Sequence, residues 1–356
     1  MINPNSKTQE QGFSILEMIV AMAVMAVITG AVFALMRDSV MTSKSSMEMS
    51  DGQQSSRTAQ EYINRDLMNA GDGLNSITNI RVPENFVTNF LALDPVTNPA
   101  TPGFINLALI TSDNDVPANS IVAGTAPAVA VRSTPVLTDR ITILQTDQTF
   151  VPITINAADI GIPTGAVAVS PADIDRFRVG EIYFMSSSIG SIFATITDRI
   201  NVGSPTPSLV FGGDAFGLNS VGAGGQLDFV SAGATLPVSL SRMKMIHYYV
   251  NDNGLLMRRV FGVRNSPFNE SMIAEHVVSL QFRYFLNMRD ANGNVVQPLS
   301  RLTTSQQQVE TRQVETTLTV ETAHALQNGQ RQQMSMTTST SVRNMQFRQS
   351  LQPSGS

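Results

Sequence analysis

A single acidic residue, Glu17, lies near the start of an otherwise apolar stretch of this chain. The stretch covers residues 13–36, follows Gly12 directly, and ends at Arg37 and Asp38. It holds roughly two dozen residues, whereas a helix that crosses a membrane needs about 20. An isolated carboxylate in such a helix costs roughly 2.5–3.5 kcal/mol, so it is expected to be functional and to have a partner. The residue types therefore predict a charge-pairing site within a membrane-spanning helix.

The arrangement of Gly12, Phe13 and Glu17 resembles the N-terminal signature of type IV pilins and type II secretion pseudopilins. In that family a short polar leader ends in Gly, and an apolar helix follows with Phe first and Glu fifth. The resemblance implies that a prepilin peptidase cuts between Gly12 and Phe13. It also implies that the new amino group of Phe13 is N-methylated and that Glu17 docks the subunit during assembly.

Elementary electrostatics agrees with this resemblance. Cleavage before Phe13 would create an amino group where the helix enters the lipid. In the family, that amine pairs with the Glu of a neighbouring subunit, and both charges are then neutralised inside the filament. A carboxylate that is costly in a lone helix would therefore favour assembly and fix the register between subunits.

Two plainer readings of the N-terminus remain open. An ordinary secretory signal has a basic start, an apolar core of 7–15 residues and a small-residue exit. Here the leader, residues 1–12, has one basic residue, Lys7, whose charge is offset by Glu10. The apolar core is longer than 15 residues, and no small-residue exit follows it. The second reading is a plain single-pass anchor in which Glu17 is incidental.

The polar stretch after the apolar run is expected to continue the same helix. No proline interrupts residues 37–72, and apolar side chains recur there at helical spacing, namely Ala59, Ile63, Leu67 and Ala70. Gly52 is a weak point, and Gly71 or Gly73 is expected to cap the end. Residues 13–36 would lie in the membrane or filament core, and the amphipathic part from about Gln53 would pack on a globular head.

Residues 73–356 are expected to form that head, which is rich in β-structure and has long loops at 95–135 and 201–235. The fold class is therefore α+β: a long N-terminal helix packed on a large antiparallel β-rich domain, as in pilins. Predicted strands cover residues 140–146, 150–155, 180–185, 191–197, 245–250, 255–260, 277–285, 309–322 and 334–347. Asn253 and Gly254 favour a type I′ turn between two of them.

The order of these strands resembles the PilW-type minor pilins, and the type II secretion pseudopilin J is similar. The segments that carry this resemblance are residues 139–143, 180–184, 248–259, 278–284 and 312–320. It implies a minor pilin that acts in the initiation or at the tip of pilus assembly. The alternatives are a type II secretion minor pseudopilin and a membrane-anchored surface adhesin.

The same resemblance implies partners and a location. The partners would be the prepilin peptidase, other minor and major pilins through the N-terminal helix, and inner-membrane lipid before assembly. The protein would span the bacterial inner membrane once with its head outside the cytoplasm, and would later reach the pilus or cell surface.

Composition excludes several classes of site. The net charge is −5 without a basic run, so no nucleic-acid site is identifiable, and the absence of cysteine excludes disulfides and thiolate metal sites. The histidines, His247, His276 and His324, are separated and are expected to be structural or at the surface. We therefore expect no enzyme activity, no metal and no cofactor.

Three segments rich in glycine or in acidic residues have plain readings as well. Residues 222–225 superficially resemble a phosphate-binding glycine loop, but no helix pattern follows them, so a loop is expected. Residues 113–115 and 290–294 have the acidic character of calcium loops, yet the second lacks the glutamate that an EF-hand supplies at its twelfth position. Hairpin turns are the expected structures, and a calcium site in the head loops is the alternative.

Overall fold

The computed structural model describes residues 14–74, 80–91, 103–117, 137–161, 164–220, 222–264, 266–289, 292–325 and 330–342. The chain divides into two compact units, each described separately below. Unit 1 comprises Met1–Asp51 and Thr322–Gln332, and unit 2 comprises Gly52–Glu321 and Gln333–Ser356. Gly12 and Phe13 lie outside the described residues.

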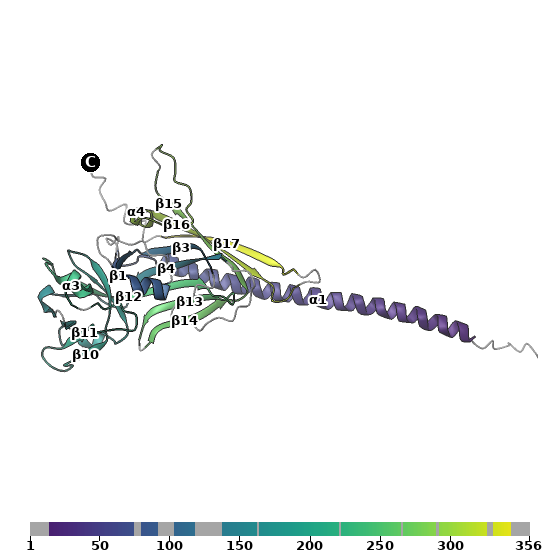
Figure 1. Cartoon of the computed structure of the whole chain (residues 1–356), viewed down its shortest axis with the longest axis horizontal. Coiled ribbons are helices and arrows are strands. Elements are labelled where there is room, and N and C mark those ends of the chain that lie inside the picture. The colour runs from purple at the N-terminus through teal and green to yellow at the C-terminus, as the bar shows by residue number, and fades with distance from the viewer. Residues whose placement is uncertain are drawn as a thin grey trace, which may run out of the picture. The chain divides into compact units, whose positions relative to one another are not determined.

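Helix α1 is the longest element and runs without interruption over Ile15–Met68 (Figure 1, purple). Its first part belongs to unit 1, where an 18-residue window has a mean hydropathy of 2.6 and no buried residue. By length and composition this part is able to cross a membrane. The helix passes through Gly30 and Gly52 and ends at Met68, short of the expected glycine caps.

The chain leaves the helix through a turn that contains both of those glycines. Gly71 and Gly73 have φ angles of 71° and 69°, a region that favours glycine. A Cβ atom on Gly73 would lie 2.2 Å from Oγ1 of Thr146. Gly73 is therefore required both by its backbone conformation and by the close approach of Thr146.

Unit 2 is built mainly of antiparallel β-structure. Among the described residues its main sheet has ten strands, and seven of them follow the order β14-β13-β12-β8-β9-β1-β2. The bounds are β1 (Ile80–Pro83), β2 (Phe104–Leu107), β3 (Ile110–Pro117), β4 (Leu137–Thr146), β5 (Ile153–Ile155), β8 (Ile182–Ser186), β9 (Ser191–Thr195), β12 (Val238–Val250), β13 (Leu256–Val263) and β14 (Ser266–Ala274). Among the described pairings, that of β1 with β9 is parallel and the others are antiparallel.

Strand β12 joins the two halves of this sheet. Its first part, up to Arg242, pairs with β5 and β8, whereas its second part, from Met243, pairs with β4 and β13. One strand of 13 residues therefore belongs to both halves of the sheet.

Two smaller sheets are also present among the described residues of unit 2. The first has the order β10-β11-β7-β6, and the second has the order β15-β16-β17, whose strands lie side by side in Figure 1. Their bounds are β6 (Ile160–Gly161), β7 (Ala166–Ala168), β10 (Asp198–Ile200), β11 (Ser208–Val210), β15 (Val277–Leu286), β16 (Thr311–Glu321) and β17 (Gln333–Ser341). The short helices are α2 (Glu84–Phe86), η1 (Val87–Leu91), η2 (Ala157–Asp159), η3 (Ile174–Arg176), α3 (Gln226–Ser231) and α4 (Ser305–Val309).

The second part of α1 packs into the core of unit 2, as its amphipathic pattern predicts. Ala59, Ile63 and Leu67 are fully buried and share one apolar cluster with residues of β3, β4, β12, β15 and β16. Burial of a side chain such as Ile63 stabilises the fold by roughly 1.5–3 kcal/mol. The long N-terminal helix and the antiparallel β-rich head confirm the α+β, pilin-like fold class.

Hydrogen bonds fix the register of this part of α1. The side-chain amide of Gln60 donates to the carbonyl of Met336 (2.8 Å), and Thr340 donates to Oδ1 of Asn64 (2.6 Å). Asp66 accepts from Tyr248 (2.5 Å) and Arg258 (2.8 Å). Since a slip of the helix would leave these buried groups unpaired, they specify one position along β17, β12 and β13.

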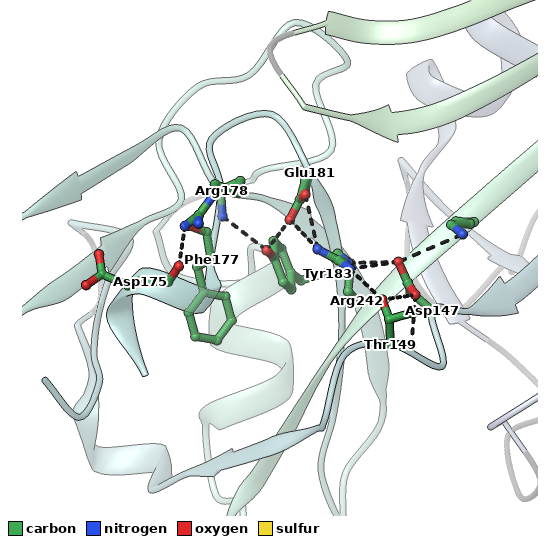
Figure 2. Close-up of polar contacts among 9 residues, drawn as sticks. Asp147, Thr149, Asp175, Phe177, Arg178, Glu181, Tyr183 and Arg242 are labelled. Atoms are coloured by element: carbon green, nitrogen blue, oxygen red, sulfur yellow. Dashed lines mark hydrogen bonds and ion pairs between the residues drawn. The ribbon is translucent and has the colours of Figure 1, made fainter. Parts of the chain in front are cut away.

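A second polar network joins the end of β4, the start of β8 and Arg242 within β12 (Figure 2). Arg242 lies between two carboxylates, with its Nε 3.0 Å from Asp147 and its Nη1 3.3 Å from Glu181. Tyr183 donates to Glu181 (2.6 Å), and both burial and this bond raise the pKa of Tyr183. The tyrosine therefore stays protonated and acts as a donor, and the network is structural.

Several predicted elements are confirmed. Strands β8 and β9 form the predicted hairpin, as do β12 and β13. Strand β16 alternates between buried and more exposed residues, as its sequence indicates. Strand β17 (Gln333–Ser341) begins one residue before the predicted range 334–347, of which residues 343–347 are outside the described part.

The prediction of a type I′ turn after β12 is wrong. The N–H of Gly254 donates to the carbonyl of Asn251, and Asn251 in turn donates to Leu255. Gly254 has a φ of 71°, whereas Asn253 is not in the positive region that a type I′ turn requires at both central positions. The loop therefore has three residues, with glycine in the left-handed position.

The predicted loops contain more regular structure than expected. Helix α3 follows residues 222–225 directly, and its Leu227 and Val230, one turn apart, are both buried. The prediction that no helix follows these glycines is therefore wrong. Strand β11 also lies within the predicted loop 201–235, and β2 and β3 lie within the predicted loop 95–135.

Candidate functional site

Glu17 forms a capping box with Ser14 at the start of α1. The N–H of Ser14 donates to Oε2 of Glu17 (3.0 Å), and the N–H of Glu17 donates to Oγ of Ser14 (3.2 Å). Each side chain thus satisfies a backbone donor that the first helical turn leaves without a partner. In the isolated chain, the carboxylate already stabilises the helix end that carries it.

The capping box adds Ser14 to the site, a residue that the resemblance to pilins did not indicate. A Ser followed three residues later by Glu, just before an apolar run, is a readable signal for such a cap. Ser14 and Glu17 both remain exposed, so the capping carboxylate is open to a second partner. The predicted cleavage and methylation positions, Gly12 and Phe13, lie outside the described residues and stay predictions.

The surface of the helix that follows is apolar on all sides. Its large side chains are more than half exposed throughout the first seven turns, namely Ile15, Leu16, Met18, Ile19, Val20, Met22, Val24, Met25, Val27, Ile28, Val32, Phe33, Leu35, Met36 and Val40. A helix that is apolar all round is stable in lipid or among other apolar helices. Glu17 therefore lies at one end of a surface that requires a nonpolar environment.

Unit 1 contains a second polar cluster, where the connection from β16 to β17 contacts α1. Both oxygens of Glu48 are used: Oε1 lies 2.6 Å from Nδ1 of His324, and Oε2 accepts from the N–H of His324 (3.1 Å). Nζ of Lys44 lies 3.2 Å from Nε2 of His324, and Ser45 donates to Gln332 (3.2 Å). His324 is therefore a structural histidine that holds this connection on the helix. Because Glu48 and His324 are 276 positions apart, no sequence pattern indicated the contact.

Removal of the Glu48 charge should loosen the connection. Burial acts to raise the pKa of Glu48, but the bonds and charge of His324 lower it overall, so the ionised form is favoured. We expect Glu48→Gln to speed hydrogen exchange of the peptide 322–325 by about tenfold, the equivalent of 1.4 kcal/mol. Exchange measured by mass spectrometry would check this, with the exposed Glu61→Gln on the same helix as the control. Equal exchange in both variants would contradict the role of Glu48.

The remaining histidines are structural within the described residues. His247 is fully buried in β12, with Nδ1 2.9 Å from Oγ1 of Thr142. Burial and the charges of Arg140 and Arg259 lower its pKa well below the ordinary value, so it is neutral. His276 lies between β14 and β15 with a φ of 55°, and its carbonyl accepts from Glu321.

The calcium alternative gains no support from the described residues. Asp113 is close to Arg301 (3.3 Å), and Asp115 accepts from Asn114 (2.7 Å), so these carboxylates already have polar partners. No group of three or more acidic or histidine side chains able to hold a metal occurs in the part of the chain that the structure describes. Part of the second acidic segment, residues 290–291, lies outside that part.

Comparison with known proteins identifies the class to which this N-terminus is similar. Residues 7–33 match the family model of the prokaryotic N-terminal methylation motif. This match includes Gly12, Phe13 and Glu17, and supports a type IV pilin-like protein that a prepilin peptidase processes. No curated protein and no solved structure matches the chain. The motif and the exposed apolar helix together indicate membrane anchoring.

Proposed function

We propose that this chain is a minor pilin of a type IV pilus machine, acting in the initiation or at the tip of pilus assembly. The observation that carries the proposal is the position of Glu17, which lies at the exposed start of an apolar helix within the matched methylation motif. The role is structural and requires no catalytic residue. The size of the β-rich head, spread over three sheets, favours a subunit present in few copies rather than the repeating one.

In this proposal Gly12 and Phe13 are the cleavage positions, the new amine of Phe13 is methylated, and Glu17 is the docking residue. Before assembly the chain spans the inner membrane once, with its head outside the cytoplasm. During assembly the carboxylate of Glu17 receives the free amine of a neighbouring major or minor pilin. The exposed capping box supports this step, because Glu17 can accept a second donor without unwinding the helix.

The decisive experiment compares Glu17→Ala with Ser14→Ala in living cells. Truncating one partner of a buried charge pair costs 2–5 kcal/mol, so we expect Glu17→Ala to be cleaved normally but incorporated at least about tenfold less into filaments. Ser14→Ala removes the cap but keeps the charge, and it should retain most of the incorporation. Quantitative immunoblots of sheared filaments, with mass spectrometry of the mature N-terminus, would measure both.

Normal incorporation of Glu17→Ala would refute the docking role. Equal loss in both variants would assign Glu17 to helix capping alone. The same comparison in cells that lack either the pilus or the type II secretion machine would show which one takes up the chain.

A further inference from the structure

Strand β17 is the outer strand of the sheet β15-β16-β17, and it pairs with β16 alone. In the same register, the N–H of Val342 donates to the carbonyl of Arg312 (2.9 Å). Antiparallel strands exchange hydrogen bonds at every second residue, so the even-numbered residues of β17 bond β16. The N–H and C=O groups of Ser335, Thr337 and Ser339 point away from β16, and no hydrogen bond joins them to another described residue. We call these backbone groups the open edge of β17.

Helix α1 covers one face of β17 but not its open edge. Gln60 bonds the carbonyl of Met336, and Asn64, one turn later, bonds the hydroxyls of Thr338 (3.3 Å) and Thr340 (2.6 Å). Strand β17 therefore runs alongside this part of α1 and in the same direction. The odd-numbered side chains of β17 are exposed on the opposite face.

The open edge of β17 lacks the features by which sheet edges avoid pairing with other chains, namely short length, charge, an irregular register or a cover. Among the other described edge strands, β2, β5, β6 and β10 have four residues or fewer. Strands β3 and β14 are longer, but both carry acidic residues and have an irregular register. Strand β15 is bonded on its outer side by Leu299, which exchanges two hydrogen bonds with Tyr284. Strand β17 instead has nine residues, no charge, no proline or glycine, and an unbroken register.

We propose that an extended segment of a different prepilin-type subunit adds to the open edge of β17 as a fourth strand. In this mode of binding, main-chain hydrogen bonds give affinity and alternate side chains give specificity. This inference rests on the proposed function and identifies the element through which the head meets a neighbour.

The exposed side chains of β17 indicate the chemistry of the added strand. The hydroxyl of Thr337 bonds that of Thr317 in β16 (3.0 Å). Ser335 bonds Thr319 in the same way (2.8 Å). Hydroxyl pairs between strands stabilise a sheet, whereas a charged side chain on the added strand would find no opposite charge on β17. The segment that fits is therefore uncharged and rich in Ser and Thr.

A second copy of this chain does not fit the proposed arrangement. Two identical edges joined by a two-fold axis form a regular ladder in the antiparallel sense. Since β17 and the second part of α1 run in the same direction, such a pair would set its two α1 helices in opposite directions, unlike subunits that insert side by side. If another segment of a copy occupied the edge, each copy would leave its own β17 open to the next. Such head-to-tail contacts generate long rows of copies, whereas the proposed subunit is present in few.

Hydrogen exchange of the peptide 333–341 tests the added strand directly. In the isolated full-length chain in detergent, the amides of Ser335, Thr337 and Ser339 should exchange fast because they have no partner. In assemblies isolated from cells through an affinity tag on this chain, we expect these amides to exchange at least about tenfold slower. The peptide 266–274, from the edge strand β14, is the internal control and should exchange alike in both samples. Equal exchange of the peptide 333–341 in both samples would overturn the proposal.

Single-cysteine variants identify the partner, because the natural chain has no cysteine. Thr337→Cys carries the probe at the open edge. Thr317→Cys is the matched control: the two hydroxyls bond each other on the same face, but Thr317 lies one strand further from the edge. Both full-length variants are labelled in cells with a short maleimide photo-crosslinker, irradiated, and analysed by mass spectrometry.

We expect a several-fold higher crosslinking yield at position 337 than at position 317. The crosslinked peptide should be an uncharged, Ser- and Thr-rich segment of a different subunit that carries its own Gly-Phe-x-x-x-Glu motif. Crosslinks confined to copies of this chain or to lipid, or equal yields at both positions, would contradict the proposal.

A matched pair of lysine variants separates the edge of β17 from its exposed face. Thr337→Lys and Thr317→Lys lose the same hydroxyl pair and place the same charge on the same face. A charge on an edge strand opposes pairing, so Thr337→Lys should recover several-fold less of the crosslinked partner subunit by affinity tag than Thr317→Lys. Equal recovery in the two variants would show that the open edge is not the binding element.

The same samples distinguish this inference from the proposed function. If the N-terminus of the chain is still Met1 in cells with an active prepilin peptidase, both proposals fail. If the chain is cleaved and incorporated but the peptide 333–341 exchanges as fast as in the isolated chain, only the added strand fails.

Discussion

Replacement of Asp66 by alanine is expected to lower the free energy of unfolding by about 3–5 kcal/mol, the range for breaking a buried ion pair. Asp66 is buried at the end of α1 and accepts from Nε of Arg258 (2.8 Å) and from the hydroxyl of Tyr248 (2.5 Å). Burial and the charge of Asp66 raise the pKa of Tyr248, so its hydroxyl always donates. The variant would leave the Arg258 charge and the Tyr248 hydroxyl without their partner inside the protein.

Urea unfolding of the full-length chain in detergent, followed by circular dichroism, would measure the effect of Asp66→Ala. The exposed Glu61→Ala, on the same helix, should change the stability by less than about 0.5 kcal/mol. A second variant, Asp66→Asn, keeps the size and one acceptor oxygen, so its loss should be smaller than that of alanine. A loss below 1 kcal/mol for Asp66→Ala would show that solvent, rather than this carboxylate, satisfies Arg258.

The helix and its two environments were predictable because they depend on local pattern. A run of apolar residues specifies a lipid-compatible surface, and the recurrence of Ala59, Ile63 and Leu67 specifies one buried face. Strand β16 was predictable for the same reason, since its alternation places Val314, Leu318 and Val320 on the buried face. Each of these features follows from residues within a few positions of one another.

Features that depend on distant partners were not predictable. Asp66 and Arg258 are separated by 192 positions, and only the folded chain shows that the acid lies buried against β12 and β13. The division of β12 between the two halves of the main sheet is likewise set by its four partner strands. The short helix α4 did have a local signal, the capping box of Thr304 and Gln307, which the strand pattern around it obscured.

The candidate site was predictable to the level of its residues but not of its geometry. The spacing of Gly12, Phe13 and Glu17 indicated a pilin-like N-terminus, and the match over residues 7–33 supports that class. The bond between Ser14 and Glu17 adds that the carboxylate has a structural role before any neighbour arrives. Assembly therefore adds a charge partner to a residue that already stabilises its own helix.

Asp139, in β4, carries a carboxylate that bridges three strands in the interior of unit 2. It is almost completely buried, and its two oxygens accept from the N–H of Phe282 in β15 (2.6 Å) and the N–H of Asp115 in β3 (3.0 Å). Burial raises the pKa of Asp139 most, the two N–H donors lower it, and the nearby Asp115 and Asp113 raise it further. The net result is a pKa of about 6, against an ordinary value of 3.8.

The stability that Asp139 contributes should therefore fall as the pH rises. Below pH 3.8 the group is protonated in both states; between pH 3.8 and 6 only the unfolded chain ionises, so unfolding becomes easier by about 3 kcal/mol in total. Above pH 6 this difference stays constant.

Asp139→Asn cannot titrate, so the free energy of unfolding of the natural chain minus that of the variant should decline from pH 4 to pH 6. Urea titrations of both proteins across this range would measure the difference, and the exposed Asp198→Asn, treated identically, should follow the natural chain. Parallel curves for the natural chain and Asp139→Asn would mean that the carboxylate is ionised throughout, held by its two N–H donors.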